Sequence, residues 1–410
     1  MSIATCVRHA ELGDLVGLLN AQQAAKVDVV APASALRASD GLLQLSGVEP
    51  VLDERGFTLV DGLYRPTAAA DSHLGSKLKI PVGYLKWLRE EARTDLYDAN
   101  INGLLHGPDD PRLPRTGDDR SFLLRLFTSG APDEPGILRA VLSDRYGIID
   151  NLDVLTAVLE GIRSADADVS VRSCDLTESS MHCKVYSPKV RALAPSFLAD
   201  YRTPFANPDL EAERRRAAGQ LERWRPVAAR EGHGYRPGSE PIVFAGFRFS
   251  NSEIGHHAVT LKPELMVEIC GNGLTLPMFA YTKRHIGDRL EVGGSWSQDT
   301  YRKRLAVITA ETRDKVAEWL SPEFLAARVT ELERHAATPV AHPERTIEVV
   351  SKKLGFTEDE RAGILSHFIA GGQLTAAGIA NAVTSYSQTI PDADRADTLD
   401  DLALQAMSLV

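Results

Sequence analysis

Three clusters of polar residues follow apolar, strand-like runs, at positions where loops on a rigid sheet tend to carry function. The clusters are Ser143, Asp144, Arg145 and Tyr146 with Asp150 and Asn151; Asn251, Ser252, Glu253, Gly255, His256 and His257; and Cys270, Asn272 and Gly273 with Lys283, Arg284 and His285. Arginine and lysine suit phosphate groups, while carboxylates and histidine transfer protons. We expect a folded β-scaffold to bring the three clusters together around something negatively charged.

Binding of nucleic acid, single-stranded DNA above all, is the first function that these residues favour. The candidate contacts are Arg145, Tyr146, Asn151, Asn251, Ser252, Asn272, Lys283, Arg284, Arg302 and Lys303. The aromatic residues that could stack on bases are Tyr146, Phe247, Tyr281 and Trp296. Phosphate contacts of this kind predict an affinity that falls steeply with salt.

Two other functions remain open from the residues alone. In a hydrolase or transferase acting on an anionic, nucleotide-like substrate, Glu253 or Asp144 would be the general base and His285 the general acid. In a protein-interaction module, the acidic C-terminal tail would dock on a partner. A perturbed carboxylate inside a pocket would favour the enzyme, whereas a ridge of cations would favour nucleic acid.

The sequence predicts neither a metal nor a cofactor. His256 and His257 are adjacent, so on a strand their side chains point to opposite faces and do not readily share one ion. The four cysteines match no zinc pattern, although Cys174 and Cys183 are placed to face each other across a hairpin. Neither GxxxxGK[ST] nor GxGxxG occurs, so nucleotide-driven work is not expected.

Composition indicates a folded protein with an uneven charge. The chain has 410 residues, 43% of them hydrophobic and 25% charged, which is typical of a globular protein of two or three domains. No apolar run reaches the roughly 18 residues that a bilayer span needs, and acids interrupt the N-terminus where a signal peptide would be apolar. We therefore expect a cytoplasmic protein without a membrane partner.

The net charge of −10 is concentrated at the C-terminal end. Residues 344–410 hold ten acidic against five basic residues. Two other segments are locally positive: Glu211–Arg236 has seven Arg against four Glu, and Lys283–Arg304 has six basic residues against three acids. Because the local patch decides anion binding, an acidic total does not exclude a nucleic-acid partner.

Hydrophobic periodicity predicts an α+β fold: a central, mostly antiparallel sheet of β-hairpins packed by helices, with a C-terminal α-helical subdomain. Helices are expected over residues 152–163 and around 300–336, with Asn151 as an N-cap and Pro322 starting a second helical segment. Hairpin strands are expected before and after these helices, with a break at Pro263.

Three regions follow from this pattern. Residues 1–70 are expected to form an N-terminal cover or oligomer-contact segment, residues 71–343 an α+β core domain, and residues 344–410 an acidic helical subdomain. An Arg-rich insertion near 192–238 interrupts the core domain. Assembly of like chains into a ring or filament stays open.

Several uncommon strings carry a family resemblance. LRAVLSDRYGIIDNLDVL, FSNSEIGHHAVTLKPELMVEICGNGL and KRHIG, with flanking parts that extend the match from about residue 74 to 405, resemble the phage/plasmid-like family called domain of unknown function 932. The resemblance implies association with phages, plasmids and other mobile elements, and work near DNA replication or recombination. His256-His257 and Gly271 depart from the family's pattern, which speaks further against a shared metal or cysteine chemistry.

Overall fold

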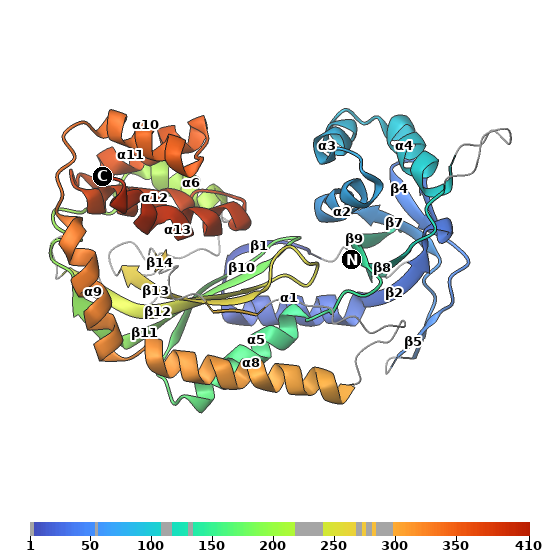
Figure 1. Ribbon diagram of the computed structural model, residues 1–410, viewed down its shortest axis with the longest axis horizontal. Coiled ribbons are helices and arrows are strands. Elements are labelled where there is room, and N and C mark those ends of the chain that lie inside the picture. The colour runs from blue at the N-terminus through green and yellow to red at the C-terminus, as the bar shows by residue number, and fades with distance from the viewer. Residues whose placement is uncertain are drawn as a thin grey trace.

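In a computed structural model, the described residues form two large β-sheets and one two-stranded sheet. Helices cover both faces of the first large sheet and one face of the second (Figure 1). The structure describes residues 4–53, 56–107, 117–129, 134–217, 241–267, 273–275, 281–283 and 298–410. Sheet A has seven strands and sheet B has six, and the pairing in sheet A is antiparallel throughout. The predicted α+β class with a C-terminal helical region is confirmed.

Sheet A contains the hairpin that the sequence predicts directly after the 152–163 helix, and the strands predicted before the helix around 300. Its strands are β1 (Val7–Ala10), β10 (Ser170–Leu176), β11 (Met181–Leu193), β12 (Ile242–Asn251), β13 (Val259–Val267), β14 (Gly273–Thr275) and β15 (Tyr281–Lys283). They run in the order β1-β10-β11-β12-β13-β14, with β15 on the free part of β13. Cys174 pairs with Cys183 across the β10–β11 hairpin, as the alternation predicts.

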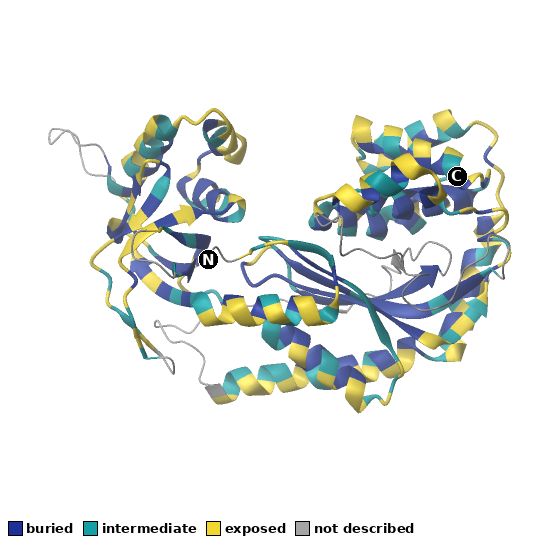
Figure 2. Ribbon diagram, turned by 180° about the vertical axis from the view of Figure 1, so that it is seen from behind, coloured by how far each residue is buried: buried dark blue, intermediate teal, exposed yellow. Residues whose placement is uncertain are grey.

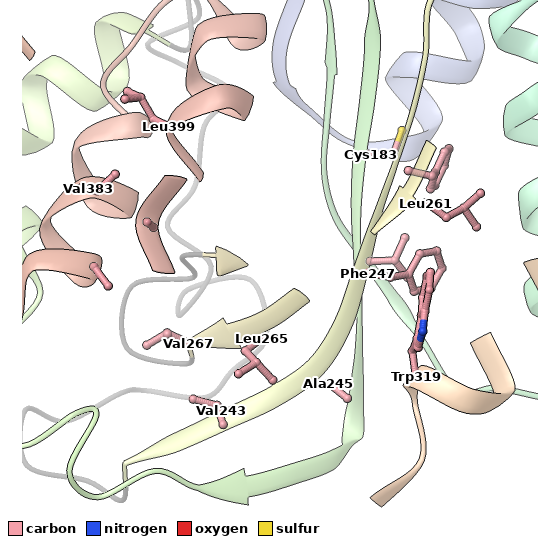
Figure 3. Close-up of a cluster of buried hydrophobic side chains, with 14 of the residues drawn as sticks. Cys183, Val243, Ala245, Phe247, Leu261, Leu265, Val267, Trp319, Val383 and Leu399 are labelled. Atoms are coloured by element: carbon pink, nitrogen blue, oxygen red, sulfur yellow. The ribbon is translucent and has the colours of Figure 1, made fainter. Parts of the chain in front are cut away.

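One face of sheet A is apolar and is covered by long helices. Alternate residues such as Val185, Phe247 and Leu261 are fully buried in one core cluster. Helices α5 (Asn151–Ser164) and α8 (Gln298–Trp319) run along this face, and Trp319 lies among the same side chains (Figures 1 and 3). Burial of this apolar surface is the main force that holds the layers together.

A glycine sets the close approach of α5 to α8. A Cβ atom at Gly161 would lie 2.7 Å from the Thr309 carbonyl oxygen and 2.7 Å from Thr312 Cβ, so only glycine fits without displacing α8. After α8, Ser321 caps α9 (Pro322–Ala336) by accepting a hydrogen bond from Phe324 N, and Pro322 takes the first turn as the sequence predicts.

Sheet B forms the second half of the molecule and has its own core. Its strands, in spatial order, are β2 (Lys26–Pro32), β8 (Ser121–Phe127), β9 (Gly136–Ser143), β7 (Gly62–Pro66), β4 (Leu42–Leu45) and β3 (Leu36–Ser39). Three helices cover its apolar face: α2 (Ala68–Leu78), α3 (Val82–Glu90) and α4 (Thr94–His106). Helix α1 (Leu12–Ala25) connects sheet A to this half (Figure 1).

A short hairpin projects from sheet B with apolar side chains in solvent. Strands β5 (Val51–Asp53) and β6 (Gly56–Thr58) pair only with each other. Leu52 and Phe57 are cross-strand partners and are 77% and 69% exposed, and Leu59 beside them is 70% exposed (Figure 2).

The C-terminal residues form a layer of helices over the other face of sheet A (Figure 1). They are α10 (Pro343–Leu354), α11 (Glu358–Gly371), α12 (Ala376–Ser387) and α13 (Ala393–Ser408), with α6 (Pro208–Ala217) beside them. The Thr357–Glu360 capping box starts α11, and Asp392 caps α13 by accepting hydrogen bonds from Asp394 N and Arg395 N.

Four details differ from the sequence-based expectations. Residues 1–70 are no separate cover, because their strands β2, β3, β4 and β7 pair within sheet B beside β8 and β9. The N-cap of α5 is Asp150 rather than Asn151. Strand β13 continues through Pro263. This residue lies between the part of β13 that pairs with β15 and the part that pairs with β14, so on that side no neighbouring strand needs the N–H that proline lacks. The insertion near 192–238 contains α6, and residues 218–238 lie outside the described part.

Candidate functional site

The face of sheet A beneath the C-terminal helices carries a row of cations. Lys184 on β11 pairs with Arg248 on β12, and Arg248 pairs with Lys262 on β13, so the three side chains lie side by side on one face. His182 adds a fourth cation two residues before Lys184. Like charges directly opposite each other destabilise a sheet unless anions offset them.

Helix α13 supplies those anions. Asp394, Asp397, Asp400 and Asp401 follow one another at helical spacing and therefore share one side of the helix. Lys184 Nζ lies 2.6 Å from Asp400 Oδ2, and Arg248 Nη1 lies 2.6 Å from Asp397 Oδ1.

Further ion pairs join the other cations of the row to aspartates of α13. Asp401 pairs with both Arg248 and Lys262. His182 Nε2 lies 2.7 Å from Asp394 Oδ1, and Nδ1 lies 3.1 Å from Asp397 Oδ1. Each cation of the row therefore has a carboxylate of α13 as its partner.

The buried surroundings of His182 determine whether its imidazole carries a charge. Its side chain is 6% exposed. Burial alone would favour neutral imidazole, but Asp397 and Asp394 more than offset it and raise the pKa of His182 to about 9. His182 is therefore a cation at neutral pH, and the pKa of Asp397 is held well below its usual range by Arg248 and His182 despite its own burial.

The same face contains aromatic side chains beside the cations. Tyr186 and Phe244 have ring centroids 5.7 Å apart and follow the alternation of Lys184 and Arg248. Tyr186 is the cross-strand partner of Gly246, and Phe244 lies two residues before Gly246 on β12. A Cβ atom at Gly246 would lie 2.6 Å from the Val185 carbonyl oxygen. A cationic row next to rings on a sheet is an arrangement that binds single strands in other proteins.

The first two polar clusters meet, as predicted, but in the interior. Asn251 Nδ2 donates to Asn151 Oδ1 at 2.8 Å and to the Ile149 carbonyl at 3.0 Å. Ser252 Oγ donates to the Ser179 carbonyl at 2.7 Å. Asn151, Asn251 and Ser252 are all at most 2% exposed. These three predicted nucleic-acid contacts therefore support the fold from inside and do not reach a ligand at the surface.

Glu253 is also internal, which removes one of the two candidate general bases of the enzyme hypothesis and leaves Asp144. Its carboxylate lies 2.9 Å from Arg139 Nη1 and 3.1 Å from Arg125 Nη1. Although burial opposes ionisation, the two guanidinium groups lower the pKa of Glu253. A general base needs access to substrate and a pKa near the working pH, and Glu253 has neither.

Arg125 is the centre of this buried group and joins the two halves of the molecule. Its side chain is 0% exposed and bonds Asp28, its cross-strand partner on β2, at 2.9 and 3.1 Å. It also contacts Asp150, at the start of α5, at 2.6 Å, and the Glu253 carbonyl at 2.6 Å. Lys26 pairs with Asp150 as well. The three cations Lys26, Arg125 and Arg139 thus meet the three carboxylates Asp28, Asp150 and Glu253.

Only the outer part of the first cluster reaches solvent. Asp144 and Arg145 are exposed, and Tyr146 is half-buried against Gly255. Burial raises the pKa of Tyr146 to about 12. Arg302 and Lys303, in the first turns of α8, are exposed too, with Lys303 Nζ 2.6 Å from Asp299. Asp144, Arg145, Arg302 and Lys303 are therefore accessible to a ligand.

The third cluster falls largely outside the described residues. Asn272, Arg284 and His285 are not among them, nor are Cys270 and Trp296, and the side chain of Lys283 is not described. Phe247, a predicted base stacker, lies in the apolar core beneath sheet A at 0% exposure.

The described residues also contain a cavity of about 460 Å³ near the N-terminus of α13. Its charged lining is Arg8, Glu178, Asp392 and Asp394, each of which already binds within the protein. Among the described residues no group of His, Cys, Asp and Glu could hold a metal ion, and none of the helices there has the length and apolar character to cross a bilayer.

Sequence reasoning noticed the acidic tail but missed its partners. Lys184, Arg248 and Lys262 look like the solvent side of ordinary amphipathic strands. The available signal was the combination of cations at alternate positions in three consecutive strands with aspartates at helical spacing in the tail. The buried ion pairs of Arg125 were harder to predict, because it is the only charged residue in an apolar run.

Comparison with known proteins gives no relative: no family model, curated protein or solved structure matches this chain. The resemblance to the phage/plasmid-like family stays a prediction.

Proposed function

We propose that this protein binds nucleic acid, single-stranded DNA in the first place, on the cationic face of sheet A. The observation that carries the proposal is the row His182, Lys184, Arg248 and Lys262 on neighbouring strands, which the aspartates of α13 cover in this structure and which would bind another anion in their place. Tyr186, which is 4% exposed, and Phe244 lie beside the row and would offer rings to bases once the helices over this face move away. A role near replication or recombination of mobile elements would accord with the family resemblance.

The geometry favours a strand over a small anionic substrate. The cations span three strands, so the row is about 10 Å long at the usual spacing between strands. A single phosphate would meet one or two of these side chains, whereas a phosphodiester strand would meet the whole row. The buried, paired Glu253 gives the alternative of acid–base catalysis no support.

Fluorescence anisotropy with labelled 30-nucleotide DNA, RNA and duplex probes tests the proposal. Four phosphate contacts to a single strand predict a log–log salt slope of about −3, or about 50-fold weaker binding at 200 mM than at 50 mM salt. No binding of any probe at micromolar protein in low salt would refute the function.

A matched pair of variants locates the binding face. Lys262→Gln removes one cation of the row, so we expect weaker binding and a slope reduced by about 0.7. Lys86→Gln removes the same charge from α3, where the side chain is 75% exposed, and should change neither. Equal effects of the two variants would mean that the row is not the binding surface.

A second candidate role is contact between copies of the chain. The observation that favours it is the β5–β6 hairpin, whose Leu52, Phe57 and Leu59 are largely exposed. If this hairpin joins two copies, Phe57→Ser will lower the sedimentation-derived mass, while Leu104→Ser, at a 44% exposed position on α4, will not. A wild-type protein that sediments as a monomer at every concentration would contradict this role.

A further inference from the structure

We propose that helix α13 is an internal competitor for nucleic acid: its aspartates occupy the cations of sheet A, and a bound strand takes their place. The proposal rests on the proposed function and adds regulation to the same site. It begins from the contrast between the two faces of sheet A.

The face toward α5 and α8 could not open without a large loss of buried apolar surface. Cys183, Phe247 and Leu261 lie on that side and are at most 1% exposed (Figure 3). The face toward α13 presents charged groups at the matching alternate positions. The contacts printed between α13 and this face are ion pairs, so separating them would hydrate charged groups, and we expect this boundary to be the one that can open.

The contacts of α13 divide in the same way. Leu399, Ala403 and Ala406 are fully buried among the other C-terminal helices and belong to the apolar core. On the side toward the sheet, Asp394, Asp397 and Asp401 keep 16 to 28% of their side chains exposed, whereas Asp400 is 3% exposed. The apolar contacts hold α13 to its helical neighbours, and the ionic contacts hold it to the sheet.

The aspartates of α13 have the spacing of a ligand for the row. From Asp394 to Asp401 the helix rises about 10 Å, which equals the length of the cationic row. Asp400 binds Lys184, and Asp401 binds both Arg248 and Lys262. A phosphodiester strand on the row would need the same side chains, so α13 and the strand cannot be bound to it together.

The segment that leads into α13 is held to the rest of the protein. The helix would therefore stay near the cationic face even when its aspartates are released from the row. Arg8 donates to the Ile390 carbonyl at 3.3 Å and to the Ser387 carbonyl at 3.3 Å, and it pairs with Asp175 on β10 at 2.7 Å. The high local concentration of a tethered competitor makes it effective even when each contact is weak.

The test compares the double variant Asp397→Asn/Asp401→Asn with the control Asp95→Asn/Asp314→Asn. The control removes the same charge at exposed positions of α4 and α8. If α13 is seated on the face in about 99% of molecules and the double variant lowers this to about 90%, the apparent Kd for a labelled 30-nucleotide oligo(dT) falls about tenfold. The control should bind like the wild type.

Hydrogen exchange of the unmodified protein gives a second reading, in case the double variant does not fold. Saturating oligo(dT) should speed exchange of amides in α13, while amides of α5 on the opposite face should not change.

The outcomes separate the two proposals. Equal affinity of both double variants and the wild type, or α13 amides that exchange no faster with oligo(dT) bound, would overturn the competitor while leaving nucleic-acid binding intact. No binding by any of the three proteins would overturn the proposed function and the inference with it.

Discussion

His182 provides the sharpest test of the ionic contact between sheet A and α13. The imidazole is held by Asp394 at 2.7 Å and Asp397 at 3.1 Å, which raise its pKa to about 9 from an ordinary 6.5. A group whose pKa is raised on folding stabilises the folded state fully below the unfolded pKa and loses that contribution as pH rises through the folded pKa. The window here is therefore pH 6.5 to 9.

The magnitude follows from the size of the shift. A rise of about 2.5 pKa units, at 1.36 kcal/mol each, corresponds to about 3 kcal/mol of stability that is present at pH 6 and gone above pH 9. Because the side chain is 6% exposed, solvent screens little of it.

Urea unfolding followed by circular dichroism between pH 6 and 9.5 measures this contribution. His182→Asn should be less stable than the wild type at pH 6, and the difference should shrink by about 3 kcal/mol toward pH 9.5. His342→Asn, at an exposed histidine, serves as the control. A difference between wild type and His182→Asn that stays constant with pH would refute the buried ion pairs.

Three further predictions concern stability. Arg125→Met leaves buried carboxylates without their main partner and should cost about 3 to 5 kcal/mol in urea unfolding, whereas Arg120→Met, half-exposed on the same side of the molecule, should cost little. Gly161→Ala should destabilise by about 1 to 3 kcal/mol by forcing α8 away, while Gly17→Ala, with open space around it in α1, should stabilise slightly; equal effects would contradict the close approach. Burial lowers the pKa of His367 to about 4, so stability should fall between pH 6.5 and 4, and this part of the fall, about 3 kcal/mol, should be missing in His367→Gln.

The predictable part of the fold is the part that local pattern controls. Alternation in β10 and β11 gave the hairpin and the Cys174–Cys183 pairing, and Pro322 gave the start of α9. These features depend on residues close in sequence, whose periodicity reports directly which face is buried.

Long-range pairing was beyond such reasoning. The strands of residues 1–70 join β8 and β9, including a parallel contact between β7 and β9, and nothing in a local window specifies those partners. Asp150 rather than Asn151 is the N-cap, and its carboxylate binds Arg125, which lies 25 positions earlier in the chain, instead of capping the helix.

The candidate site shows the same limit. The sequence indicated polar clusters that converge, and Asn151, Asn251 and Glu253 do come together. The burial of Glu253 could not be predicted from the sequence, because it depends on ion pairs with Arg125 and Arg139, which lie on strands of sheet B. The composition showed that the C-terminal tail is acidic. It did not show that the aspartates of the tail bind cations on β11, β12 and β13.

The most direct measurement of the central claim is cross-linking of a bromodeoxyuridine-substituted single strand, with the modified peptides identified by mass spectrometry. We predict adducts on β11 to β13, at Tyr186 and its neighbours on the cationic face, and more of them in the Asp397→Asn/Asp401→Asn protein. Binding at the cationic face of sheet A would be contradicted if the adducts were confined to sheet B or to the outer surface of α8. In that case the peptides of the cationic face would be unmodified in both proteins.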